Sequence, residues 1–135
     1  MPKSAPDTNP YTNLQSENAG RVALTAFFNL ANHWDLSTAE MAQLLGNIKN
    51  SRFFDWKKNH NQKIPADTME RISYLLGIYK SLLILLPTKE AAHEWVKKPN
   101  GHFNNISALE FILNNGFSGL IDVRRYLDAE RGAHD

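Results

Sequence analysis

Residues 37–58, which read STAEMAQLLGNIKNSRFFDWKK, decide the fold. Ser37 and Glu40 stand in the pattern of a capping box, in which each side chain accepts a hydrogen bond from the other residue's backbone N–H. The pattern predicts the start of a helix that runs to Leu45. Gly46 should end it, because glycine readily adopts the positive φ that closes a helix in a tight turn.

The second half of the stretch mixes apolar anchors with cations. We expect a second helix over residues 50–59, capped by Asn50 or Ser51, with apolar residues such as Phe53 facing inward. Two helices joined at a glycine corner form a helix–turn–helix, whose second helix enters the major groove of DNA. Residues 46–63 hold five cations and one acid, a net charge of +4 in a chain of formal net charge +1, which suits DNA phosphates. The predicted DNA contacts are Lys49, Asn50, Ser51, Arg52, Lys57, Lys58 and Lys63.

A solvated basic helix is the alternative, because helix–turn–helix geometry also occurs in proteins that never touch DNA. Asn47 lies between Gly46 and the apolar anchor Ile48, so the turn is one residue longer than in the repressor-type motif. A longer turn could tilt the second helix and change or abolish its docking. A single copy would hold only a few base pairs, so useful specificity should require a homodimer and two half-sites.

The rest of the chain predicts helices with short connections. An apolar stripe between Pro65 and Pro87 predicts a connecting helix of about twenty residues, part of which would form a dimer contact. No stretch shows the alternation typical of strands, so we expect an all-α domain of about seven short helices. The other helices are expected over residues 18–34, 89–98, 107–114 and 117–130, the last ended by Gly132.

Four regions follow from this pattern. Residues 1–16 are rich in Pro, Ser, Thr and Asn and predict a flexible N-terminal tail. The other regions are a helix–turn–helix at residues 17–63, the connecting or dimerisation helix at residues 64–87, and a C-terminal helical region at residues 88–135.

Composition and spacing exclude several other classes. The 135 residues include no cysteine, which excludes disulfides, thiolate metal sites and a cysteine nucleophile. The five histidines lack the spacing of a zinc-binding helix, and no glycine-rich phosphate loop follows a strand. We therefore expect no metal, no cofactor and no enzymatic activity. The sequence shows no apolar segment that could span a bilayer or direct export, so we expect a soluble cytoplasmic protein without a membrane partner.

The second half of the chain resembles a known family. Residues 95–103, WVKKPNGHF, are similar to the W-x-x-x-P-N-x-x-F segment of the MbcA/ParS/Xre antitoxins. Residues 109–113 and 119–129 resemble the closing helices of that family, and residues 18–63 resemble its Xre-like helix–turn–helix. Asn105 and Ala108 replace the Gly and Pro that the family pattern has before the penultimate helix. Asparagine tolerates the left-handed conformation, so the turn can be retained.

The resemblance implies an antitoxin of a type II toxin–antitoxin pair. Such proteins neutralise a RES-domain toxin, which attacks NAD+ or uses it for ADP-ribosylation, with their C-terminal toxin-binding region. Their helix–turn–helix typically represses their own operon. The implied partners are a RES-domain toxin and operator DNA. Arginine and tyrosine commonly anchor interfaces, and the candidate toxin contacts on the last helix are Arg124, Arg125, Tyr126, Asp128 and Arg131.

Two alternatives stay open at this point. The charges of the last helix could form a solvated face with ordinary ion pairs between residues four apart, such as Arg124 and Asp128. The whole chain could instead be a stand-alone, dimeric Xre-type transcription repressor that has no toxin partner.

Overall fold

The computed structural model describes residues 18–134, and the predicted tail at residues 1–16 lies outside them. The described residues fold into seven α-helices, which confirms the expected all-α class. The helices are α2 (Ala19–His33), α3 (Thr38–Leu44), α4 (Asn50–Lys58), α5 (Ala66–Leu85), α6 (Lys89–Glu94), α7 (Ala108–Asn115) and α8 (Phe117–His134). Between α6 and α7 lie the 3-10 turns η3 (Trp95–Lys97) and η4 (Gly101–Phe103) and the strands β1 (Pro99–Asn100) and β2 (Ile106–Ser107).

Two expected helix ends are wrong. The helix expected over residues 89–98 ends as α6 at Glu94 and tightens into η3, because the approaching Pro99 disfavours α-helical backbone in the residue before it. The last helix continues through Gly132 to His134, because Gly132 does not take the positive φ that would end it.

Two other local expectations also fail. Lys49 is the N-cap of α4, in extended conformation and without a side-chain cap, so neither Asn50 nor Ser51 has the expected capping role. The strands β1 and β2 were not expected. They form a short antiparallel ladder in which Asn100 pairs with Ile106, too short to leave an alternating pattern in the sequence.

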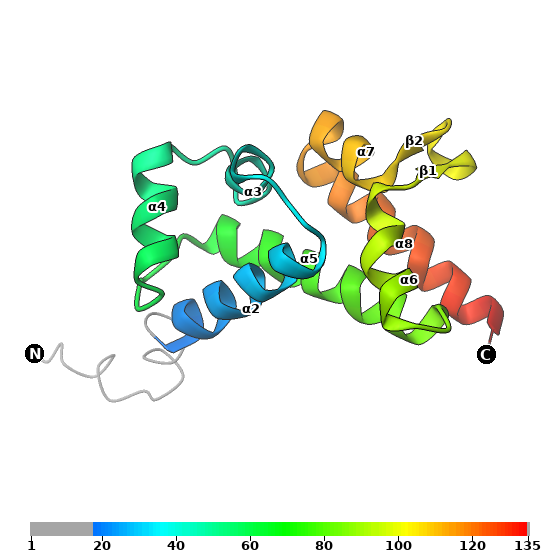
Figure 1. Cartoon of the computed structure of the whole chain (residues 1–135), viewed down its shortest axis with the longest axis horizontal. Helices are drawn as coiled ribbons and strands as arrows, with labels where there is room; N and C mark the ends of the chain where they lie inside the picture. The colour runs from blue at the N-terminus through cyan, green and yellow to red at the C-terminus, as the bar shows by residue number, and fades with distance from the viewer. Residues whose placement is uncertain (1–17, 135) are drawn as a thin grey trace, which may run out of the picture.

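The long helix α5 is the axis of the molecule. It contacts α2 and α8 most extensively, and α2, α3 and α4 gather at one end of the molecule while α6, α7 and α8 gather at the other (Figure 1). Ile72, Leu75, Ile78 and Leu82 recur every three or four residues and are all buried, as expected of a helix face that packs against its neighbours. The connecting helix predicted from the apolar stripe is confirmed, and both ends of the molecule pack against it.

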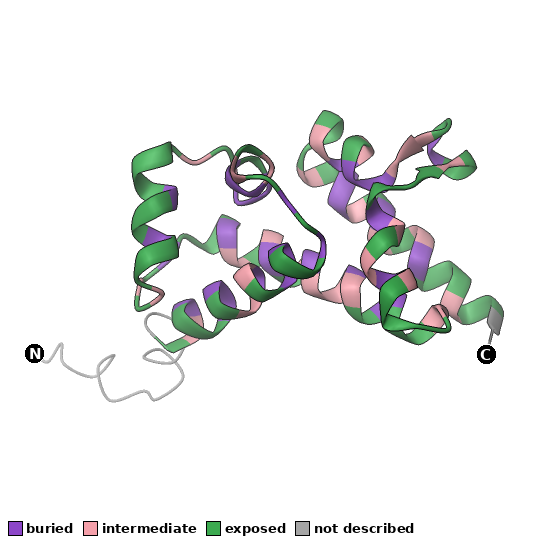
Figure 2. Ribbon diagram, in the orientation of Figure 1, coloured by how far each residue is buried: buried purple, intermediate pink, exposed green. Residues whose placement is uncertain are grey.

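Buried positions recur along the helices of the N-terminal end (Figure 2), and close backbone approaches also hold this end together. A Cβ atom at Gly20 would lie 2.0 Å from the backbone oxygen of Gln62, so only glycine lets the loop after α4 reach α2. The Thr68 hydroxyl donates to the Leu45 carbonyl over 3.1 Å and joins the start of α5 to the end of α3. These contacts fix both the entrance and the exit of α4.

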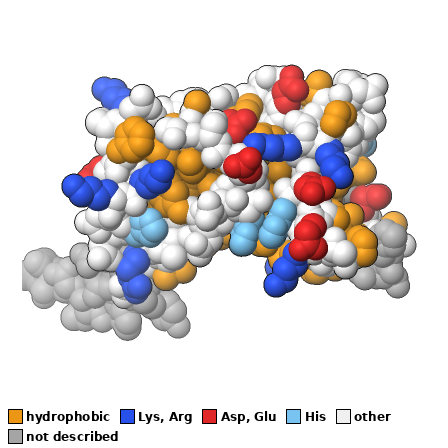
Figure 3. All heavy atoms as spheres, viewed as in Figure 1, with side chains coloured by type: hydrophobic (Ala, Val, Ile, Leu, Met, Phe, Trp, Pro, Cys, Tyr) orange, Lys and Arg blue, Asp and Glu red, His pale blue; other side chains and the backbone are white. Residues whose placement is uncertain are grey.

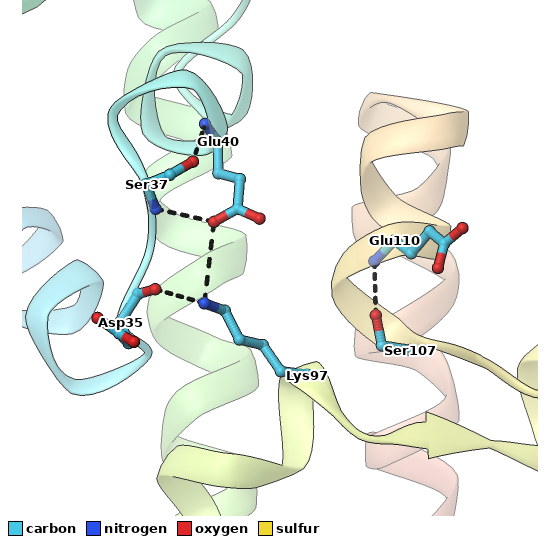
Figure 4. Close-up of polar contacts among 6 residues, drawn as sticks. All are labelled: Asp35, Ser37, Glu40, Lys97, Ser107 and Glu110. Carbon is cyan, nitrogen blue, oxygen red and sulfur yellow. Dashed lines mark hydrogen bonds and ion pairs between the residues drawn. The ribbon is translucent and has the colours of Figure 1, made fainter.

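The C-terminal end is built around α7 and α8. Leu120, Val123 and Leu127 of α8 are buried. The turn before β2 places Asn104 and Asn105 at φ 58° and 68°, which confirms that asparagine serves in the left-handed position. Ser107 caps α7 as expected, because its hydroxyl accepts a hydrogen bond from the Glu110 amide over 3.0 Å (Figure 4).

Candidate nucleic-acid interface and C-terminal face

The corner between α3 and α4 has the geometry that the sequence predicts. Ser37 accepts from the Glu40 amide over 3.1 Å, and Glu40 accepts from the Ser37 amide over 2.8 Å (Figure 4). Gly46 has φ 114° and Asn47 has φ 58°, so the additional residue of the turn is also left-handed. Asparagine is among the few non-glycine residues that adopt this conformation readily, and the extra residue is therefore accommodated within the corner.

Helix α4 has one buried side and one exposed side. Phe53 and Trp56 are fully or almost fully buried and attach the helix to the N-terminal core. The seven predicted DNA contacts all lie on the surface: Lys49, Asn50, Ser51, Arg52, Lys57, Lys58 and Lys63. The structure therefore gathers them at one end of the molecule, where basic side chains are prominent in the space-filling view (Figure 3).

An open hollow of about 750 Å³ runs beside α4 and the following loop. Arg52 and Lys63 both line it, and the Arg52 guanidinium carbon lies 5.9 Å from the centre of the Trp56 ring. Asp55 also lines the hollow and lies 3.5 Å from the Gln62 amide nitrogen, which can donate to it. Cations on both sides of a hollow suit a phosphate backbone.

A second hollow of about 390 Å³ lies at the start of α4, where Lys49 and Arg52 are among the lining residues. No side chain caps this helix end. Backbone N–H groups at a helix start are suited to anions, as is the positive end of the helix dipole. The start of α4 therefore presents amide donors beside two cationic side chains.

The predicted toxin contacts on α8 divide into two groups. Arg124 and Arg131 point towards α5: the Arg124 guanidinium carbon lies 5.9 Å from the centre of the Tyr74 ring, and Arg131 Nη1 donates to the buried Ser81 hydroxyl over 3.4 Å. Arg125 and Asp128 are exposed. Asp128 also lies 3.5 Å from Arg124 Nε. This is the ion pair between residues four apart that a solvated charged face, the alternative to toxin contact, would form.

Tyr126 belongs to an aromatic cluster at the junction of η4, α7 and α8. Its ring stacks on His102 with the ring centres 4.0 Å apart, and His102 is exposed while Tyr126 is half-buried. Phe103 is buried beneath them and lies edge-on to Trp95. The His102 and Tyr126 rings therefore form an aromatic surface. The WVKKPNGHF segment supplies His102 and the buried Phe103 beneath it.

Three polar contacts between the ends of the molecule were not predicted. Lys97 donates to the Asp35 carbonyl and its ammonium lies 4.0 Å from a Glu40 carboxylate oxygen (Figure 4). Gln43 donates to the Leu113 carbonyl over 2.9 Å. The partners in these contacts are 57–70 residues apart in the chain, so no local pattern could have indicated them.

Within the described part of the chain, no three His, Asp or Glu side chains are placed to hold a metal ion. No helix between residues 18 and 134 has the length and apolar character needed to cross a membrane.

Comparison with known proteins matches two families along the chain, and the boundary between the two matches lies within α5. Residues 14–77 match the family described as "Antitoxin Xre-like helix-turn-helix domain". Residues 81–132 match the family described as "Antitoxin Xre/MbcA/ParS C-terminal toxin-binding domain". The chain is also similar to "Uncharacterized protein y4oB" of Sinorhizobium fredii (strain NBRC 101917 / NGR234), with 43% identity over 119 residues that cover 87% of this chain and 92% of that protein.

Proposed function

Because the chain belongs to the Xre/MbcA/ParS family of antitoxins, we propose that it neutralises a RES-domain toxin that consumes NAD+ and represses its own operon as a homodimer. The two matched families are antitoxin and helix–turn–helix families, not families of enzymes. In this proposal α4 binds operator DNA, and the region from η3 to α8 binds the toxin.

The placement of the two regions at opposite ends of α5 carries the proposal. The exposed cations of α4 lie at one end, and the aromatic surface of His102 and Tyr126 belongs to the other (Figure 1). A protein that must hold a toxin and a DNA duplex together needs two separate surfaces. The contacts of Lys97 and Gln43 across the junction keep these surfaces in a fixed relation.

The exposed members of the predicted toxin contacts are the ones that we assign to the toxin. Arg125, Asp128 and the edge of Tyr126 are accessible, whereas Arg124 and Arg131 use their guanidinium groups on α5. We assign Arg124 and Arg131 a positioning role, because they hold α8 against α5 and thereby orient the accessible residues.

A dimer contact is proposed at the end of α5. Leu83 is 40% exposed and Ile84 is 55% exposed. Large aliphatic side chains side by side on a surface favour contact with another apolar surface. A second copy of the chain would cover these two side chains.

Co-expression with the protein encoded in the adjacent reading frame tests the toxin assignment. We expect the two proteins to purify together and Arg125→Glu to break the complex, because the reversed charge would face the toxin. Arg21→Glu makes the same charge change on the exposed surface of α2 and should leave the complex intact. A point substitution is needed because deleting α8 would remove the buried Leu120, Val123 and Leu127.

The stand-alone repressor remains the second candidate, because the basic face of α4 is consistent with either function. It predicts that the purified chain binds its promoter and captures no co-encoded protein. If Arg125→Glu leaves the complex intact, the assignment of Arg125 as a toxin contact is wrong. If the wild-type chain captures no co-encoded protein, the result favours the stand-alone repressor.

A further inference from the structure

Phe54 is an apolar side chain on the outward face of α4. The outward-facing residues are Ser51, Phe54, Asp55 and Lys58, which are spaced as one face of a helix. Phe54 is 51% exposed. Its neighbour Phe53 points into the N-terminal core and is fully buried, so the next residue along the helix is turned away from that core.

Packing against the core of the described residues does not explain why an apolar ring stands at position 54. Its ring lies edge-on to Phe53, with ring centres 5.2 Å apart and planes at 78°. Half of a phenyl ring left in water contributes little to folding, since the stabilisation from burial scales with the apolar area removed from water. The exposed part of the ring is therefore free for a ligand.

The charges around Phe54 indicate the kind of ligand. Arg52, Lys57 and Lys58 are exposed on the same helix and outnumber its one acid, Asp55, and an apolar protein surface would have to desolvate these charges in order to cover the ring. A DNA duplex would not, because its phosphates would pair with the cations along the rims of the groove. The ring would then point at the base edges, where the one apolar group in the major groove is the 5-methyl of thymine.

We propose that Phe54 is a specificity residue that contacts the 5-methyl group of thymine in the major groove of the operator. The inference rests on the proposed function, in which α4 is the DNA-reading helix. It adds an apolar base contact to the seven predicted contacts. Those seven carry charges, an amide or a hydroxyl, and they are suited to phosphates or to hydrogen-bonding base atoms.

Replacing thymine by uracil tests the contact directly, because uracil lacks the 5-methyl group and keeps the same hydrogen-bonding atoms. The probe is the duplex that spans the promoter of the chain's own operon, made once with thymine and once with uracil. The wild-type chain should bind the uracil duplex more weakly, by about fourfold for each methyl contacted, which is the burial free energy of one methyl-sized group.

Phe54→Ala should bind the thymine duplex as weakly as the wild type binds the uracil duplex, and it should no longer distinguish the two. The dependence of affinity on salt should stay the same, because Phe54 carries no charge. Phe54→Leu keeps an apolar side chain and should retain part of the preference for thymine. Val22→Ala is the matched control, since Val22 is 60% exposed on α2 outside α4.

Three outcomes would overturn the inference in distinguishable ways. If the wild type binds neither duplex, the proposed DNA-binding function fails and the inference fails with it. If Phe54→Ala binds DNA and loses as much affinity on uracil as the wild type does, the inference alone fails. If Phe54→Ala binds both duplexes like the wild type but loses the co-encoded toxin or the dimer, the ring belongs to a protein interface.

Discussion

Gly20 illustrates how a single missing side chain lets the loop after α4 pack against α2. A Cβ atom there would lie 2.0 Å from the Gln62 backbone oxygen, and backbone cannot move aside as the end of a flexible side chain can. We expect Gly20→Ala to lower the free energy of unfolding by about 1–3 kcal/mol, as overpacking does, although alanine is the better helix former. Chemical denaturation measures the change.

Gly132 provides the control for Gly20. Both glycines lie in helices, but a Cβ atom at Gly132 would have no atom within 4 Å. Gly132→Ala should therefore raise the free energy of unfolding by up to about 1 kcal/mol through helix propensity alone. Equal effects of the two substitutions would show that the approach of the loop to α2 does not position α4.

The helix α4 concentrates the cations that we propose as phosphate contacts. Arg52→Ala with Lys57→Ala should lower the affinity for promoter DNA and reduce the slope of log affinity against log salt by about 2, since each lost phosphate contact removes about 0.9. Titrations at several salt concentrations measure the slope. The control is Lys80→Ala with Lys89→Ala, which removes two exposed cations from α5 and α6, and an unchanged slope in the α4 variant would exclude these residues from the DNA contacts.

At the scale of the elements, local chemistry determined what the sequence could predict. The capping residues Ser37, Thr88 and Ser107 each mark a helix start in the structure as in the sequence, because a cap acts on backbone groups only two or three residues away. The left-handed turn at Asn105 was predicted from the family pattern, because asparagine tolerates positive φ where that pattern has glycine. The prediction that Gly132 ends the last helix was wrong, because glycine is needed at a helix end only when φ becomes positive there.

Tertiary packing explains what the sequence could not predict. The spacing of Phe53 and Trp56 indicated the buried side of α4, and the exposed positions of the seven predicted DNA contacts follow from it. On α8 the sequence predicted the same role, toxin contact, for Arg124 and Arg125. Only the crossing of α5 and α8 separates them, since a Cβ atom at Gly77 would lie 2.0 Å from Arg124 Nη1.

At the scale of the whole molecule, Lys97 ties the C-terminal region to the start of α3. Its contacts are the Asp35 carbonyl and the Glu40 carboxylate. We expect Lys97→Ala to speed amide hydrogen exchange over residues 35–40 while lowering the free energy of unfolding by only about 1 kcal/mol, because exposed ion pairs contribute little. Mass spectrometry of the exchanged protein measures this.

Lys98 is the matched control for Lys97. It pairs with Glu94 on the neighbouring turn over 3.2 Å, and both side chains are well exposed. Lys98→Ala should leave the exchange of residues 35–40 unchanged. The same acceleration in both variants would mean that the loss of any cation from this segment speeds exchange over residues 35–40. The contacts of Lys97 would then not couple the two ends of the molecule.

The central claim is that one chain holds DNA and toxin at opposite ends of α5. Sedimentation of a labelled promoter duplex with the antitoxin, followed by addition of the co-encoded toxin, tests it most directly. We predict that the duplex sediments with the antitoxin and then sediments faster as the toxin joins the same particle. Release of the duplex in proportion to bound toxin would contradict the claim, because it would mean that the two ligands compete for one surface.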